Sequence, residues 1–379
     1  GKVRNVPGFG AKTEQGLLEA IADHQRDHKK QKRLHIHQAE RIADQVMNYL
    51  RTSKDVIELG VAGSLRRGQE TVGTIRLVAS SKNPAAVVKH LLRFPLIIKI
   101  AEQFETSCKV ELAEEATIVL KAVQPNQFGL TLFLETGSES HLKKITDIAN
   151  RKGLTLDREH LELGIKSNGK AKSLRTRKKP FQLRDEAAIY PLLGMQYIAP
   201  ELREDEGEIE AALNKSLPDE LITLADIQGM IHCHTTYSDG KHSIAEMART
   251  AEAMGMKYLT ITDHSPTAFY AGGLKLDRLK RQWEEIDETQ EQVKIKLLKG
   301  TESDILADGS LDYPDQVLEQ FDIVIASIHS RYKMDSEKMT RCLITAMQQP
   351  VFKIWGHALG RLIQRRPPFA CHMERVLDV

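Results

Sequence analysis

The spacing of apolar and polar positions in the first part of the chain predicts a small α/β unit. Residues 36–52 carry apolar side chains near the spacing of one helix face, which predicts an amphipathic helix. Residues 3–21 predict a turn followed by a helix. Three segments predict strands of one sheet: 55–64, 74–81 and 116–123.

The second part of the chain has a different pattern, because strand-like and helix-like segments alternate from residue 227 onward. Helices are expected at 243–256, with Ser243 at the N-cap, and at 276–292. Five segments predict strands: 229–235, 257–265, 293–305, 321–330 and 351–358. Repeated alternation implies parallel strands, in either a barrel or a doubly wound sheet. Before this part, residues 174–180 predict an exposed basic loop and residues 199–221 a charged helical linker.

Length and composition narrow the class of protein. A chain of 379 residues is long enough for two to four domains. It has no apolar run of about 18 residues, so we expect no membrane span, and we expect no signal peptide. The cysteines form no Cys-x-x-Cys pair, which fits a reducing cytosol and argues against a zinc finger. They are Cys108, Cys233, Cys342 and Cys371.

The net charge of +2 hides an asymmetry between the two parts of the chain. Residues 1–180 hold 32 Lys and Arg against 20 Asp and Glu, whereas the remainder holds 22 against 32. A basic half suits a polyanion such as nucleic acid, and an acidic half suits metal cations. Charge alone leaves open that both halves are simply solvated surfaces.

Each expected strand of the second part has, at or just past its carboxyl end, a residue of a type that binds metals. His232 and His234 share one face of a strand and Cys233 points to the other, because side chains alternate. In a parallel barrel the carboxyl ends of the strands converge on one face, so ligands from five strands would meet there. The further strand-end residues are Asp239, Asp263, His264, Glu302, Asp304, His329 and His357.

Imidazole and carboxylate together suit Mn, Fe or Zn rather than Ca. Several such ligands predict a multinuclear cluster that activates a water and binds phosphoryl oxygens. Other histidines fit a surface position better. His35 and His37 open a helix, where positions i and i+2 diverge, and His242 and His372 lie on expected helices.

A second group of residues resembles a phosphate-binding loop. The segment GSLRRGQETVGTIRLV, residues 63–78, offers backbone, hydroxyl and guanidinium donors. Two-metal nucleotidyl transfer needs an Asp-x-Asp pair on the following strand, but Thr74-Ile75-Arg76 stands there. Near the start, Gly8 and Gly10 place backbone amides where they could face a phosphate at a helix N-terminus.

The strand-end motifs resemble the polymerase-and-histidinol-phosphatase (PHP) domain, and the order of parts resembles bacterial family X DNA polymerases (PolX). The PHP motifs are HCHTTYSDG, ITDHS, GTESDI, ASIHS and GHALGRLIQRRPP. The family resemblance rests on GSLRRGQETVG, QFGLTLFLETGS and IAPELREDEGEIEAA before them. It implies a fingers-palm-thumb module followed by a distorted (β/α)7 barrel. It also implies a manganese-dependent 3′–5′ exonuclease and 3′-end phosphoesterase used in DNA repair.

The same resemblance implies domain bounds and residue roles. Residues 1–50 would be helix-hairpin-helix or fingers, 51–135 palm, 136–205 thumb, 206–226 linker and 227–379 PHP domain. Gly63, Ser64 and Arg67 match the triphosphate-binding loop, and Gly8, Gly10 and Lys12 match the DNA-binding hairpin. Asp263 and Arg361 are expected to serve catalysis. The expected metal ligands are His232, His234, Asp239, His264, Glu302, His329 and His357.

The sequence departs from the family pattern at two places. Thr74, Arg76 and Val119 replace the three palm carboxylates, and Leu134-Glu135 replaces an aromatic pair, so we expect polymerase activity to be lost. The chain ends before the last Asp-x-His pair of the family's barrel and starts within its first domain. We therefore expect a chain truncated at both ends with an incomplete barrel.

The leading functional prediction is a manganese-dependent phosphoesterase, with Zn or Fe as alternatives, acting as a monomer on the 3′ ends of gapped or nicked DNA. Two alternatives stay open: a phosphatase for small molecules such as histidinol phosphate, and a non-catalytic DNA-binding protein. A DNA polymerase is the least favoured reading.

Overall fold

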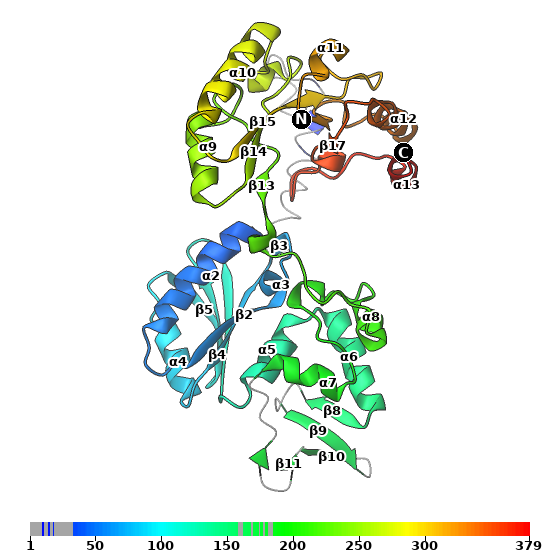
Figure 1. Ribbon diagram of the computed structural model, residues 1–379. Coiled ribbons are helices and arrows are strands. Elements are labelled where there is room, and N and C mark those ends of the chain that lie inside the picture. Colours follow the sequence, from blue (N-terminus) through cyan, green and yellow to red (C-terminus); the bar gives the residue numbers. More distant parts are fainter. Residues whose placement is uncertain are drawn as a thin grey trace. The chain divides into compact units, whose positions relative to one another are not determined.

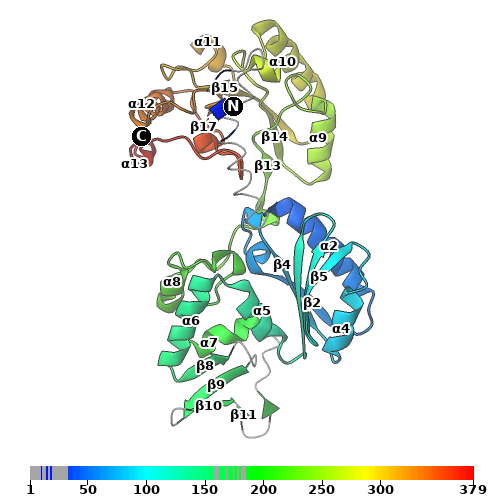
Figure 2. The same ribbon diagram turned by 180° about the vertical axis from the view of Figure 1, so that it is seen from behind.

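The chain divides into two compact units, Gly1–Asp219 and Glu220–Val379 (Figures 1 and 2). A computed structural model describes Gly10, Glu14, Gln15, Leu18 and six segments: 33–157, 162–167, 170–173, 175–176, 179–180 and 185–379. Each unit has its own hydrophobic cores and is described by itself. None of the helices in these segments is long and apolar enough to cross a membrane.

The first unit is built on a five-stranded sheet with the order β2-β4-β7-β6-β5. The predicted amphipathic helix is α2 (Ile36–Arg51), which packs with α4 (Pro84–Leu91) on one face of the sheet, while α5 (Phe128–Thr136) covers the other. All pairs are antiparallel except β4 with β7. The strands are β2 (Glu58–Ala62), β4 (Ile75–Ser80), β5 (Ile97–Gln103), β6 (Ser107–Leu112) and β7 (Thr117–Val123).

A second core in the same unit is helical. It gathers apolar side chains from α5, α6 (Glu139–Arg151), α7 (Ile189–Leu192) and α8 (Glu208–Asn214). Ile209 and Ala212 of α8 are buried there, so the predicted linker 206–226 is wrong in its first part. The apolar i, i+3 spacing of these two residues docks the helix despite its charged surroundings.

Several short elements complete the first unit. Strand β1 (Leu34–His35) pairs with β3 (Thr71–Val72), and α3 (Gly63–Arg66) lies between β2 and β3. Within the predicted basic loop, β11 (Arg175–Thr176) pairs with β12 (Lys179–Pro180). A three-stranded antiparallel sheet holds β8 (Leu154–Asp157), β9 (Glu162–Ser167) and β10 (Lys170–Ser173).

The second unit holds five parallel strands in the order β13-β14-β15-β16-β17. Helices α9 (Ile244–Ala253) and α10 (Leu276–Gln290) share a core with β14 and β15, and α12 (Ser336–Met347) shares one with β16. As predicted, Ser243 caps α9, in a reciprocal capping box with Glu246. The strands are β13 (Gly229–Met230), β14 (Tyr258–Ile261), β15 (Lys296–Asp304), β16 (Ile323–Ser327) and β17 (Ile354–Trp355).

Strand order separates the two arrangements that the sequence left open. Each strand pairs with the next along the chain, whereas a doubly wound sheet reverses its strand order at a switch point. The described residues form a sheet of five parallel strands, fewer than the seven of the expected barrel. The seven-stranded barrel therefore stays a prediction. The two short helices of this unit are α11 (Asp315–Leu318) and α13 (Met373–Leu377).

Candidate metal centre

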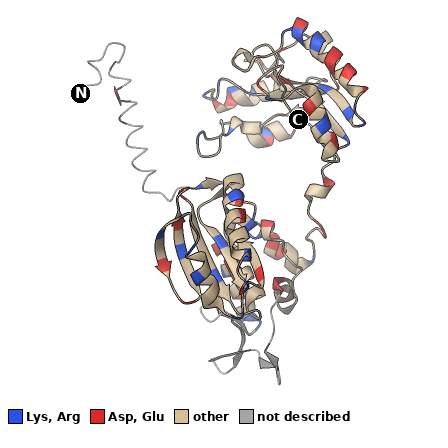
Figure 3. Cartoon of the chain, turned by 90° about the vertical axis from the view of Figure 1, so that its left-hand side faces the viewer, with Lys and Arg blue, Asp and Glu red and all other residues tan. Residues whose placement is uncertain are grey.

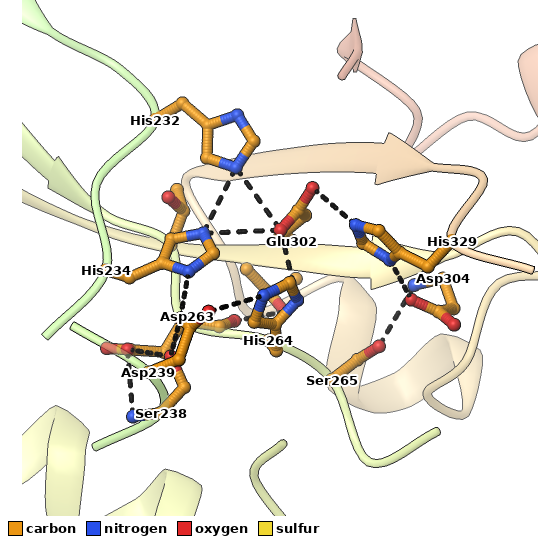
Figure 4. Close-up of polar contacts among 12 residues, drawn as sticks. His232, His234, Ser238, Asp239, Asp263, His264, Ser265, Glu302, Asp304 and His329 are labelled. Atoms are coloured by element: carbon orange, nitrogen blue, oxygen red, sulfur yellow. Dashed lines mark hydrogen bonds and ion pairs between the residues drawn. The ribbon is translucent and has the colours of Figure 1, made fainter. Parts of the chain in front are cut away.

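The histidines and acids predicted at the strand ends lie together at the carboxyl edge of the parallel sheet (Figure 4). His264 follows β14, and Glu302 and Asp304 lie at the carboxyl end of β15. His329 follows β16 by two residues, and His357 follows β17 by two residues. The strand predicted over 229–235 is regular only at β13. Beyond it, the Cys233 amide donates to the Thr262 hydroxyl at 2.9 Å, while the Thr262 amide still donates to the Cys233 carbonyl at 2.8 Å, so a side chain replaces one of the backbone bonds.

Glu302 is the hub of this cluster and is 1% exposed. Its Oε2 atom lies 3.3 Å from Nε2 of His232, 3.2 Å from Nε2 of His234 and 3.1 Å from Nδ1 of His264. Its Oε1 atom lies 3.1 Å from Nε2 of His329 and 2.6 Å from Nε2 of His357. One carboxylate therefore faces five imidazoles, three at one oxygen and two at the other.

Two further carboxylates orient individual rings. Asp239 Oδ1 lies 2.7 Å from Nδ1 of His234, and Asp304 Oδ1 lies 2.5 Å from Nδ1 of His329. Each ring also turns its Nε2 atom toward Glu302, so Nε2 is the atom placed to bind a cation when the acid holds Nδ1–H. The second oxygen of Asp239 lies 3.7 Å from Nε2 of His264, so Asp239 belongs to the cluster as well.

The charges in the cluster shift the proton affinities of its members. Burial would raise the pKa of Glu302, but hydrogen bonds from four surrounding histidines hold it far below its usual range. Burial opposes protonation of His329, but its bonds to Asp304 and Glu302 raise its pKa to about 9. Burial lowers the pKa of His264.

The donor set fits a divalent cation. Nε2 of His232 and Nε2 of His234 approach to 3.2 Å, and so do the Nε2 atoms of His329 and His357. Nδ1 of His264 is buried and makes no hydrogen bond. Converging nitrogen lone pairs beside a buried carboxylate are ligands that Mn, Fe or Zn accept. Three groups of ligand atoms each lie within 4.8 Å of one another: His232-His234-Glu302, His234-Asp239-His264 and His264-Glu302-His329.

The structure gives Asp263 a different place from the one expected for a catalytic residue. It is 3% exposed, and its two oxygens accept hydrogen bonds from Thr235, Ser238 and Gln282 rather than from a histidine ring. These bonds hold the turn that carries Asp239. Asp263 is therefore a positioning residue of the cluster. Arg361 is exposed and extended just after the short helix Ala358–Gly360.

Sequence reasoning placed Asp304 at the strand end but did not give it a role. It is buried, its carboxylate accepts a hydrogen bond from Nδ1 of His329, and its backbone amide donates to the Ser265 hydroxyl oxygen at 3.0 Å. Its position two residues after Glu302, on the same face of β15, was the available signal. Cys233, predicted to lie behind the strand, packs against the core under α9 and α10.

The phosphate-loop residues line a cavity of about 550 Å³ in the first unit. Arg76 and Lys121 both donate to Glu135, at 2.9 and 2.6 Å. The positively charged Arg76 side chain thus stands where the family pattern has a metal-binding carboxylate. Arg76 of β4 pairs with Val119 of β7, which replaces another of these carboxylates. Gly63 adopts a left-handed conformation with φ of 66°, and Ser64 is half-buried.

Arg67 differs from its predicted phosphate-binding role. Its Nε donates to Glu204 at 2.5 Å and its Nη1 to the Thr136 carbonyl at 2.6 Å. These two hydrogen bonds connect the loop to Glu204 and to the last residue of α5. Arg67 still reaches the cavity wall, together with Gly63 and Ser64.

The remaining predicted residues are placed only in part. Gly8 and Lys12 lie outside the described residues, and Gly10 is exposed with its carbonyl accepting the Glu14 amide at 3.0 Å. His37, His242 and His372 are exposed, and His35 caps α2. All four lie outside the Glu302 cluster, as predicted.

Comparison with known proteins agrees with this division of the chain. Residues 231–366 match the PHP domain, and residues 131–204 match the DNA polymerase beta thumb. Over 383 aligned residues, covering the whole chain, 35% are identical to the DNA polymerase/3′-5′ exonuclease PolX of Bacillus subtilis. The chain is a PolX-like protein with a PHP domain.

The PolX-like chain spans 64% of the length of the Bacillus subtilis protein. Its PHP part is also similar to smaller proteins. It is 35% identical over 158 residues to the probable phosphatase TTE1963 of Caldanaerobacter subterraneus, which is 39% of this chain and 56% of that protein. It is 36% identical over 157 residues, 38% of this chain and 57% of the relative, to the probable phosphatase Teth514_1060 of a Thermoanaerobacter species.

Proposed function

We propose that this PolX-like chain is a metal-dependent phosphoesterase that removes nucleotides from DNA 3′ ends through its PHP domain. The observation that carries the proposal is the Glu302 carboxylate, buried at the strand ends and faced by five imidazoles. The name of the Bacillus subtilis relative, which includes a 3′-5′ exonuclease, supports the reaction class.

Seven residues would hold the cations. Manganese is the favoured ion, and zinc and iron fit the same donors. When bound, such ions supply an activated water and positive charge for the phosphoryl oxygens. The residues are His232, His234, Asp239, His264, Glu302, His329 and His357.

The chain's own residues prepare this site before any ion arrives. Glu302 places one oxygen toward His232, His234 and His264 and the other toward His329 and His357, so its carboxylate would serve both groups of histidines when ions bind. With an ion bound, Asp239 and Asp304 would hold the Nδ1 protons of His234 and His329, and the Nε2 atoms of the two rings would be the ligand atoms. Asp263 fixes the turn beneath them.

The first unit would serve as the DNA-binding part. Residues 1–180 carry the excess of basic residues, and the thumb match belongs to a polymerase that handles DNA. Figure 3 shows that basic and acidic positions occur on the elements of both units, so the DNA-binding surface would include only some of the basic ones. The resemblance to PolX also leads us to propose the remaining domain bounds and the seven-stranded barrel. On the same ground we propose that the chain is a monomer and lies in the cytoplasm.

Polymerase activity would be absent from the palm. Arg76 and Lys121 form ion pairs with Glu135 in the cavity where two divalent ions would have to bind. A site with fixed cations and no Asp-x-Asp pair repels the ions that nucleotidyl transfer requires.

The test is hydrolysis of a 3′-labelled oligonucleotide by chain stripped of metal and then supplied with manganese. We expect label release that EDTA abolishes and that His232→Ala reduces at least about 100-fold, in line with losing a ligand of the ion. Release unaffected by EDTA, or an equally active His232→Ala, would reject a metal-dependent site.

The second candidate is a phosphatase for small phosphate monoesters, favoured by the probable phosphatases that resemble residues of the PHP part. Manganese-dependent release of phosphate from histidinol phosphate, with no cleavage of DNA and DNA affinity independent of salt, would select it.

A further inference from the structure

Two adjacent aromatic side chains project from the loop that follows His264. Phe269 is 84% exposed and Tyr270 is 64% exposed, and both lie in the short helix η5 (Phe269–Ala271). A single exposed apolar side chain is ordinary, but neighbouring exposed rings beside a polar site are an unusual use of surface. We refer to Phe269 and Tyr270 as the aromatic pair.

The loop holds the aromatic pair outward in a fixed conformation. Ala268 and Ala271, which flank the pair, are buried. The Gly273 amide donates to the Ala268 carbonyl at 3.1 Å, and a Cβ at Gly273 would lie 2.0 Å from the Ser265 carbonyl oxygen, so only glycine fits. The exposure of the two rings is therefore built into the turn and costs no ordering when a ligand binds.

The aromatic pair borders the Glu302 cluster. The Tyr270 ring centroid lies 6.4 Å from that of His264, and the Phe269 centroid lies 6.0 Å from that of Tyr270.

A second ring and a cation continue this border. Tyr332 follows His329, a residue of the cluster, by three positions along the chain. The Arg366 guanidinium lies 3.7 Å over the Tyr332 ring and donates to the Gly360 carbonyl at 2.9 Å. Aromatic rings can stack with the bases of a nucleic acid, and a nearby guanidinium can bind its phosphates.

We propose that the aromatic pair stacks the unpaired terminal bases of a DNA strand whose 3′ phosphodiester enters the Glu302 cluster. This rests on the proposed function and names its substrate class: single-stranded or frayed 3′ ends. Every base has an aromatic face, so the stacking is independent of sequence. A phosphate ester without a base has nothing to stack on the pair, and paired ends must first unpair.

The first test compares DNA with a base-free diester. The double variant F269A/Y270A should lower kcat/KM on a single-stranded oligonucleotide about 10- to 100-fold relative to an oligomer of abasic deoxyribose phosphates, which has no aromatic ring. Tyr270→Phe should keep the DNA preference because the ring remains. The control is Met254→Ala, an apolar residue that is 58% exposed and lies between α9 and β14, at the opposite end of the strands.

The second test removes the bases instead of the rings. The unaltered chain should cleave an oligonucleotide with two abasic 3′-terminal residues with a lower kcat/KM than normal DNA. The fold-decrease should be about the same as the decrease that F269A/Y270A causes on normal DNA. The double variant should not distinguish the two oligonucleotides, since coupled partners give non-additive losses. Additive losses would overturn the stacking assignment.

A third test does not depend on catalysis. An oligonucleotide with 5-iodouracil at its 3′ end and a phosphorothioate at the last linkage is irradiated with the chain. We expect the adduct on the tryptic peptide 258–275, which contains the aromatic pair. Adducts only elsewhere overturn the platform even if DNA hydrolysis is found. If hydrolysis fails but the adduct forms on this peptide, the proposed function fails and the base-binding platform stands.

Discussion

Oε1 of Glu302 lies 2.6 Å from Nε2 of His357, although 55 residues separate them along the chain. The contact spans the ends of β15 and β17, with β16 and its His329 between them. The other Glu302 oxygen faces His232, His234 and His264, at the opposite side of the carboxylate. Glu302 thus joins ligands from all five strands into one site.

Glu302→Gln should remove manganese binding while leaving the fold intact. An amide offers one acceptor oxygen and no charge, so neither group of histidines keeps its anionic partner. We expect at least one bound ion per chain to be lost and hydrolysis to fall by at least about 100-fold. Metal content after dialysis and isothermal titration check this. Glu319→Gln, an exposed acid of the same unit, is the control, and a Glu302→Gln variant that binds manganese normally would contradict this role of Glu302.

Asp304→Asn should weaken manganese binding through His329. The carboxylate holds the Nδ1 proton of His329, and loss of such a partner typically costs about 10- to 100-fold in metal affinity. Asp308→Asn is the matched control, since Asp308 is exposed on the following turn and bonds only locally to Ser310. Equal manganese affinities of the two variants would show that Asp304 does not position His329.

Asp263→Asn should lower stability more than it lowers chemistry. Its carboxylate accepts hydrogen bonds from Thr235, Ser238 and Gln282, and an amide leaves some of these buried donors unpaired, at about 1–3 kcal/mol each. The melting temperature of the second unit should fall, and added manganese should restore most of the activity. A variant with unchanged melting temperature and abolished activity would instead support a direct catalytic role for Asp263.

The metal-ligand cluster was predictable because strand ends of a parallel sheet meet at one edge whatever the details of the loops. The sequence did not reveal that the strand expected over 229–235 is irregular. There the Thr262 hydroxyl, rather than a backbone carbonyl, accepts the Cys233 amide hydrogen. The helix α8 was read as linker because its charged residues outnumber Ile209 and Ala212, the two that dock it. The structural use of Arg67 depends on Glu204, 137 residues away, a contact that no local pattern reveals.

The buried ion pairs of the first unit predict acid sensitivity. Burial would raise the pKa of Glu186, but Arg66 and Arg203 lower it from 4.5 to about 2. Because the folded pKa is depressed, this stabilisation is fully present above about pH 4.5 and is lost as pH falls toward 2, with a magnitude of about 3 kcal/mol. Arg203 itself is fully buried against three aromatic rings.

Glu186→Gln should therefore destabilise the first unit by about 3–5 kcal/mol at pH 7, since it leaves Arg203 buried without its charge partner. The variant should also lose less stability than the unaltered chain between pH 4.5 and pH 2. Urea unfolding followed across this range checks both statements. Glu201→Gln is the exposed control, and an unchanged pH dependence in Glu186→Gln would assign the acid sensitivity to other groups.

A gel assay on a 5′-labelled DNA duplex with a single-stranded 3′ tail tests the central claim most directly. The chain is incubated with manganese, with and without the four deoxynucleotides, beside Glu302→Gln. We predict shortening of the labelled strand in both conditions, absent in Glu302→Gln, and no lengthening. A labelled strand that stays intact with manganese bound would contradict the phosphoesterase, and lengthening with deoxynucleotides would contradict the account of Arg76 and Glu135 in the palm.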